Sequence, residues 1–214
     1  DIGARYALSR AGEVALALTI PCAVALVVIP LPLVSVLFER GAFNADDTAA
    51  TALAVTIYGL GLPAFVLQKI LQPLFFARED TRSPFHYAVV AMVVNAVLAV
   101  GLAYAVGWLA AAIATTVAAW VMVWQLARGA RGFGDVARFD DQFRRRLWRI
   151  VLASAPMGAV LWGMSAVLGP AFGLAGWRWL AMLVLIAIGT AAYGLFGQGL
   201  GAFRLQEIQT RLRR

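Results

Sequence analysis

Few residues in this 214-residue chain could do chemistry, and Lys69 is the clearest, because it interrupts a long apolar run together with Gln68 and Gln72. Residues three and four apart share one face of a helix, so these polar groups are expected to lie near one another. An ionisable group within a membrane is costly and indicates function. The three residues could line a wet cavity and bind an anionic substrate. The alternative is a lysine whose four-carbon stem reaches the aqueous interface.

Asn95 and Thr115 form a second candidate site, near the middle of two apolar runs that a very short turn separates. The short turn makes the two runs antiparallel neighbours, and counting from it brings both residues to a similar depth. One interpretation is an interhelical hydrogen bond. The other is a cation site, which usually needs more oxygens and a carboxylate. Neither run contains a carboxylate.

The remaining chemistry is sparse. The chain has one histidine, His86, and one cysteine, Cys22, which leaves no zinc site, no thiol–imidazole pair and no disulfide. No nucleotide-binding loop occurs. The arginines are spread along the ends of apolar runs without a soluble recognition fold, which argues against nucleic acid. We therefore expect no metal, no cofactor and no nucleic-acid partner.

The composition indicates the class of protein that must position these residues. The chain is 62% hydrophobic and 14% charged, whereas soluble domains are about 45–50% apolar and about 25% charged. Apolar runs of about 20 residues predict membrane-spanning helices, because lipid requires the backbone to satisfy its own hydrogen bonds. We predict an all-α integral membrane protein with six such helices: Val14–Leu37, Thr48–Phe76, Phe85–Tyr104, Trp108–Leu126, Leu147–Leu168 and Trp177–Gly197.

Arginine and lysine counts predict the orientation of these helices. Fifteen arginines fall in the N-terminal segment, in the turns after the second and fourth helices and in the C-terminal tail. The opposite side has two, Arg40 and Arg178. Because cytoplasmic loops carry the excess of positive charge, both termini are predicted to be cytoplasmic.

Prolines within the predicted helices are expected to kink them, either as irregularities of packing or as joints of a transporter that changes shape. They are Pro21, Pro30, Pro63, Pro73 and Pro156.

The stretch LQPLFFAREDTRSPF, residues 71–85, is predicted to be a cytoplasmic turn that acts as a hinge or gate. Pro73 and Pro84 flank its charged residues. The charged side chains are expected to stay in water and to pair locally; they are Arg78, Glu79, Asp80 and Arg82.

Residues 127–146 are predicted to be the longest loop, and Asp140 or Asp141 could cap a short helix in it. Phe139, Phe143 and Leu147 would share one face of that helix. Arginines at 144, 145, 146 and 149 could then bind anionic lipid head groups, as could the tail around Leu205, Ile208 and Leu212. Simple anchoring by positive charge is the alternative.

Two motifs resemble a known family in order and spacing. They are VSVLFERGAFNADDT, residues 34–48, and KILQPLFFAREDTRSPF, residues 69–85. Both are similar to the MurJ/MviN family, lipid II flippases of the MOP exporter superfamily. The resemblance implies that the six helices match the last six of fourteen, so the N-terminal part of the same chain is missing. Residues 1–130 would be four helices of the second lobe. Residues 131–214 would be a cytoplasmic linker, two extra helices and a basic tail.

The resemblance also implies a function. The full-length protein would move a lipid-linked peptidoglycan precursor across the bacterial cytoplasmic membrane by alternating access, without being an enzyme. The two extra helices would form a groove for the lipid tail, and the missing part would hold most of the head-group site. Lys69 matches a lysine of similar sequences. Asn95 and Thr115 match a cation site of some relatives, but Ala99 replaces its carboxylate.

Two other functions fit parts of the sequence. A different MOP-type exporter, of polysaccharide-lipids or drugs, would use the same scaffold. A membrane enzyme acting on polyprenyl lipids would need convergent acids or bases. The close acidic pair at the predicted cytoplasmic face, Glu79 and Asp80, points in different directions and suits that role poorly.

Overall fold

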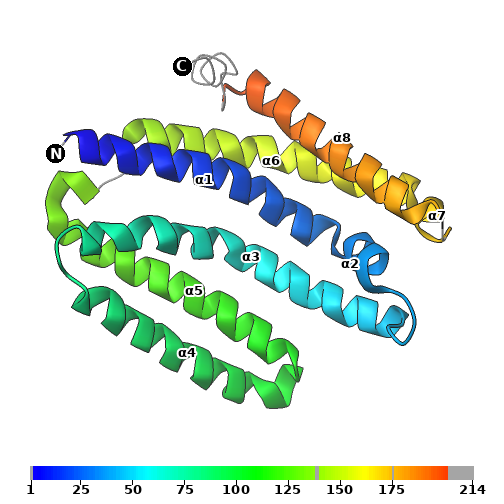
Figure 1. Ribbon diagram of the computed structural model, residues 1–214, viewed down its shortest axis with the longest axis horizontal. Helices are drawn as coiled ribbons and strands as arrows, with labels where there is room; N and C mark the ends of the chain where they lie inside the picture. The colour runs from blue at the N-terminus through cyan, green and yellow to red at the C-terminus, as the bar shows by residue number, and fades with distance from the viewer. Residues whose placement is uncertain (1, 138–139, 175, 202–214) are drawn as a thin grey trace.

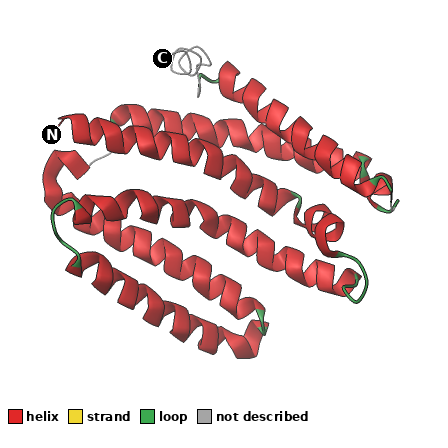
Figure 2. Cartoon of the chain, viewed as in Figure 1, coloured by secondary structure: helices red, strands yellow, loops and turns green. Residues whose placement is uncertain are grey.

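The computed structural model describes residues 2–137, 140–174 and 176–201, and every regular element among them is helical (Figure 1, Figure 2). The elements are α1 (Ile2–Val28), α2 (Pro30–Phe38), α3 (Ala45–Phe76), α4 (Arg82–Val106), α5 (Leu109–Ala130), the 3-10 helix η1 (Arg131–Ala137), α6 (Asp141–Val167), α7 (Gly169–Phe172) and α8 (Arg178–Gly199). Six helices are long and apolar enough to cross a membrane. The predicted fold class and number of spans are therefore confirmed.

The first predicted helix, residues 14–37, differs from the structure. Its apolar run is divided into α1, which begins at Ile2, and α2, which begins at Pro30. Proline has no N–H to donate to the preceding turn and is favoured at the first position of a helix, so a new helix begins there. The other four prolines lie inside unbroken helices.

The predicted long loop at residues 127–146 is also shorter in the structure. Helix α5 continues to Ala130, and η1 follows directly. Asp140 does cap a helix, since its carboxylate accepts a 2.6 Å hydrogen bond from the Phe143 N–H. That helix is α6, which continues unbroken to Val167, so the expectation of a separate short helix was wrong. Arg138, Phe139 and the tail from residue 202 lie outside the described residues.

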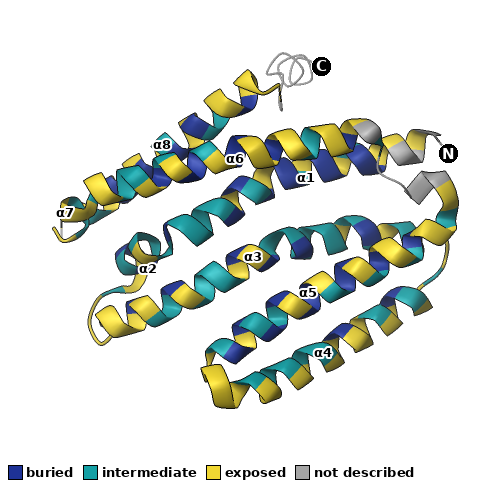
Figure 3. Cartoon of the chain, turned by 180° about the vertical axis from the view of Figure 1, so that it is seen from behind, coloured by how far each residue is buried: buried dark blue, intermediate teal, exposed yellow. Residues whose placement is uncertain are grey.

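The spanning helices form a row in the order α4, α5, α3, α1, α6 and α8, each packed on the next (Figure 1). The row contains two separate hydrophobic cores. One lies among α3, α4 and α5, and the other lies among α1, α2, α6 and α8. Exposed positions cover much of α4, at the edge of the row, where Pro84 and Ala91 are the buried residues (Figure 3).

The two ends of the row differ in their loops. One end holds the start of α1, the α3–α4 turn, η1 and the start of α6, and we call it the arginine-rich end (Figure 1). The opposite end holds α2, the α4–α5 turn and α7. Each end of the row therefore holds the same segments that the arginine count assigns to one side of the membrane.

Candidate functional site

The structure separates the three polar residues predicted to act together on α3. The Gln68 side-chain amide donates a 3.0 Å hydrogen bond to the Ala119 carbonyl of α5. Lys69 is exposed, and Gln72 is half-buried. Neither makes a side-chain hydrogen bond or ion pair with another described residue. Gln68 therefore joins two helices, whereas the Lys69 ammonium group remains available to a ligand.

Asn95 and Thr115 lie at the same depth, as their distance from the turn predicted. The Asn95 amide donates to the Thr115 hydroxyl at 3.3 Å, which makes the predicted interhelical hydrogen bond. Both residues border an open groove of about 450 Å³ between α3, α4 and α5, and Gln68 borders it as well. The groove thus joins residues from two predicted sites. Its lining contains no carboxylate, and cation sites prefer several oxygens.

The α3–α4 turn is bound to η1. The Arg78 guanidinium lies 4.2 Å from the centre of the Phe133 ring and donates to the Phe133 carbonyl at 3.3 Å. Phe133 also packs edge-on against Phe75 of α3, with ring centres 4.9 Å apart. The turn predicted as a hinge is therefore attached at one side to a neighbouring segment.

The charged residues of this turn do not pair with one another as expected. Among the described residues, no ion pair joins Arg78, Glu79, Asp80 and Arg82. Asp80 instead accepts a 3.0 Å hydrogen bond from the Ser83 N–H. Hydrogen bonds from the Ser83 side chain and backbone hold the pKa of Asp80 below its usual range. Glu79 adopts a left-handed conformation, with φ of 58°, which ends α3 tightly.

A second groove, of about 490 Å³, lies between α1, α6 and α8, and its lining is mostly apolar. Sequence reasoning assigned a groove to the last two helices and missed α1. The lining residues are Ala17, Leu18, Pro21, Cys22, Ala25, Ile29, Met157, Leu161, Ile186, Gly189, Thr190, Tyr193, Gly194 and Gln198. The sequence feature that could have indicated α1 is its stretch of small residues with Pro21, but such a stretch does not show which helix it faces.

A buried charge at the arginine-rich end was also missed. Glu13 of α1 is only 6% exposed. One carboxylate oxygen accepts hydrogen bonds from Arg10 and, at 2.9 Å, from Arg146 of α6. Arg10 also donates to Gln142 at 3.0 Å. Glu13 lies near the end of an apolar run, where a charged residue looks exposed in sequence, so nothing in the sequence indicated this cluster.

The opposite end has a polar contact between α8 and the loop after α2. Arg178 donates to the Glu39 carbonyl at 3.2 Å, and the Thr48 hydroxyl donates to the Glu39 carboxylate at 2.9 Å. Hydrogen bonds from Ser35 and Thr48 hold the pKa of Glu39 below its usual range.

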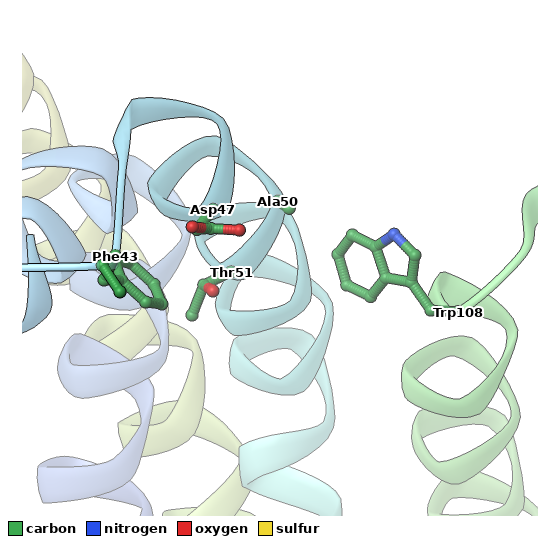
Figure 4. A pocket seen from close by; sticks show the side chains of 6 residues that line it. Phe43, Asp47, Ala50, Thr51 and Trp108 are labelled. Carbon is green, nitrogen blue, oxygen red and sulfur yellow. The ribbon is translucent and has the colours of Figure 1, made fainter.

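A hollow at the same end lies between the start of α3 and Trp108 (Figure 4). Asp47 is its charged residue, but that carboxylate accepts a 3.0 Å hydrogen bond from Asn44 N–H and completes a capping box. Trp108 stands across from α3, away from Asp47 (Figure 4). Tryptophan is enriched at membrane interfaces, which accounts for its exposure. In the described part of the chain, no group of three or more metal-ligating side chains occurs.

Comparisons with known proteins place the chain in a family. The family model "Lipid II flippase MurJ" matches residues 3–182. Proteins described as "Probable lipid II flippase MurJ" are similar: that of Rhizobium tropici is 37% identical over 96% of this chain, and that of Rhizobium meliloti is 39% identical over 96%. In both cases the chain spans 39% of the relative's length.

A solved structure has the same fold. "Lipid II flippase MurJ, inward closed conformation" superposes with a TM-score of 0.75 at 25% identity, over 91% of this chain and 38% of that one. Six apolar helices and these bacterial relatives make the chain a multi-pass protein of the bacterial inner membrane. The chain belongs to the lipid II flippase MurJ family.

Proposed function

We propose that this chain is part of a lipid II flippase, which moves lipid-linked peptidoglycan precursor across the cytoplasmic membrane during cell wall biogenesis. The chain spans about 39% of the curated relatives it matches, so the transport activity is that of the longer protein. Two lobes would rock about a central cavity in alternating access. Membrane crossing requires no covalent chemistry, so the protein acts as a transporter and not as an enzyme.

The groove between α1, α6 and α8 is the observation that carries this proposal. Its wall is apolar along three helices and open on one side. A long hydrocarbon chain can lie in such a groove, because apolar contacts replace those it makes with lipid tails. The lipid tail would remain there while the polar head crosses through the part of the protein that precedes residue 1.

The proposed division of the chain follows from the same role. Residues 1–130 would belong to the second lobe, as four of the last six helices of fourteen, with both termini cytoplasmic. Residues 131–214 would add the linker and the pair α6 and α8. Contacts of α1 with both α3 and α6 support a direct attachment of this pair to the lobe.

Filling the groove tests the proposal. Thr190 lines it and is exposed, so Thr190→Trp would occupy the space of the lipid tail. The matched control is Leu183→Trp on the same helix, which is 64% exposed and does not line the groove. In the full-length protein, we expect Thr190→Trp to fail to complement a strain depleted of its lipid II flippase, and the control to complement it. Equal growth of both strains would contradict the proposal.

Lys69 is proposed to contact the anionic pyrophosphate part of the substrate, and the half-buried Gln72, three residues along α3, would border the same path. We expect Lys69→Ala to reduce transport of lipid II in vesicles, and Lys69→Arg to retain most of it because the positive charge remains. A polysaccharide-lipid supplied as competitor separates lipid II transport from a broader exporter activity. Undiminished transport by Lys69→Ala would remove this residue from the site.

Anionic membrane lipids are proposed as a second kind of partner at the arginine-rich end. Arg144, Arg145 and Arg149 are exposed there, at the start of α6. Exposed arginines near a membrane surface attract anionic head groups.

A further inference from the structure

Helices α1 and α6 run side by side in the same direction along one seam. Residues of the two helices make successive contacts along this seam. Ser9 accepts a 3.2 Å hydrogen bond from the Asp140 N–H. Glu13, one turn further along α1, accepts a hydrogen bond from Arg146. Beyond these, Ala17 and Ile150 share a small buried cluster. The polar contacts therefore lie at the arginine-rich end of the seam, and apolar contacts continue from there.

The Glu13 cluster, which we define as Arg10, Glu13, Gln142 and Arg146, is an interhelical contact of charged groups. A buried carboxylate without a cationic partner is strongly unfavourable, whereas an apolar pair at the same place would be tolerated. The second carboxylate oxygen of Glu13 is buried and has no hydrogen-bond partner. The carboxylate thus depends on its two arginines, and a slip of α6 by one turn would leave it with Arg10 alone. Charged pairs of this kind can fix the register of two helices.

The seam leads directly into the apolar groove. Ala17, one turn beyond Glu13, is the first groove residue on α1, and Cys22 lies about 13 Å further along the helix than Glu13. On α6 the groove is lined by Met157 and Leu161. The position of α6 on α1 therefore sets the width of the groove.

We propose that Glu13 is a positioning residue, which fixes α6 against α1 through Arg146 and thereby sets the shape of the groove that takes the lipid tail. The ligand of the groove rests on the proposed function; the control of its shape does not. Arg178, which holds the start of α8 to the Glu39 carbonyl, provides the corresponding contact at the opposite end. Between these ends, Tyr193 of α8 donates a hydrogen bond to the Ala17 carbonyl of α1, but no such bond joins α6 to α1 among the described groove residues. The spacing of α6 from α1 is therefore the part of the groove that responds when the Glu13 contact is removed.

Cys22 offers a reporter, because it is the single cysteine of the sequence, is exposed and lines the groove. In the full-length protein, with any cysteine outside this segment replaced, the rate of Cys22 labelling by a membrane-permeant maleimide measures access to the groove. We expect Glu13→Gln and Arg146→Gln to increase that rate severalfold, because a wider groove uncovers the part of the exposed thiol that the groove wall still covers. Arg146→Lys keeps the positive charge and should restore a rate near that of the wild type.

Two controls separate this effect from general loosening. Arg145→Gln changes a neighbouring arginine that is exposed and makes no contact with Glu13, so Cys22 labelling should stay at the wild-type rate. A reporter Met92→Cys on α4, in a Cys22→Ser background, should not respond to Glu13→Gln. If Glu13→Gln does not fold, Arg146→Gln gives the answer, since Arg10 still pairs with Glu13.

The proposal is overturned if folded Arg146→Gln labels at the wild-type rate, or if Arg145→Gln or the α4 reporter responds as strongly. Labelling requires no lipid II, so a wild-type rate in these variants leaves the flippase proposal intact. Conversely, full complementation by Thr190→Trp would remove the lipid-tail role of the groove without changing the labelling result.

Discussion

The bundle of α3, α4 and α5 and the bundle of α1, α6 and α8 are held together by different kinds of contact. In the first, side chains donate to backbone carbonyls or hydroxyls of a neighbouring helix within the span. These contacts are Gln68 to Ala119, Asn95 to Thr115, Thr116 to Ile57 and Trp120 to Leu60. In the second, the charged contacts lie near the two ends, at Glu13 and at Arg178.

The middle of the second bundle depends on close packing. Gly158 of α6 lies so near α1 that an added Cβ would stand 2.8 Å from a Val24 methyl group. Tyr193 adds a hydrogen bond from its hydroxyl to the Ala17 carbonyl, at 2.7 Å. Association of helices in lipid relies on such packing and on polar contacts, because no hydrophobic force joins them there. The second bundle therefore keeps its charged contacts at the ends and joins its middle by close packing and the Tyr193 hydrogen bond, whereas the first bundle has several interhelical hydrogen bonds within the span.

The largest expected effect is steric, in the second bundle. Gly158→Leu would force α6 away from Val24, whose branched side chain has little freedom to move. We expect the free energy of unfolding of the full-length protein in mixed micelles to fall by about 1–3 kcal/mol. Tryptophan fluorescence during detergent titration measures this change.

Gly163→Leu is the matched control for that prediction. Gly163 lies on the same helix, and an added Cβ meets nothing within 4 Å. The control should be neutral or stabilised by about 0.5–1 kcal/mol, because leucine favours the helix more than glycine does. Equal destabilisation by both substitutions would contradict the close contact of Gly158 with Val24, because only Gly158→Leu places atoms against α1.

A smaller effect is expected from a polar contact in the first bundle. Gln68→Leu removes the donor to the Ala119 carbonyl, which still accepts the hydrogen bond of its own helix. Hydrogen bonds between helices in membranes contribute on the order of 1 kcal/mol, so we expect a loss of that size in the same titration. Gln72→Leu, which removes no hydrogen bond to a described residue, should cost less. A larger loss in the free energy of unfolding for Gln68→Leu than for Gly158→Leu would contradict our ranking, in which close packing in the second bundle contributes more than one polar contact in the first.

Sequence patterns predicted the helices well because length and apolarity decide them. The Asn95–Thr115 contact was also predictable, since a short turn fixes how two antiparallel helices face each other. The break at Pro30 was not, because Pro21, Pro63, Pro73 and Pro156 occur in similar runs and leave their helices unbroken. The contact of Glu13 with Arg146 joins residues 133 positions apart. Such a pair depends on which helices become neighbours, and helix periodicity alone does not specify that.

The smallest expected effect concerns pH and the turn that ends the first bundle at the arginine-rich end. Asp80 accepts the Ser83 N–H, and its pKa is lowered in the folded protein. A carboxylate of this kind stabilises the fold above its unfolded pKa, about 4, and loses that contribution as pH falls through the folded value. Protection of the Ser83 amide from hydrogen exchange, corrected for the intrinsic rate, should therefore be constant at neutral pH and decrease below about pH 4. Asp80→Ala should lack the protection at every pH, while Glu79→Gln should keep the wild-type profile. A profile that does not change with acid would show that the backbone of α4, and not the Asp80 carboxylate, protects this amide.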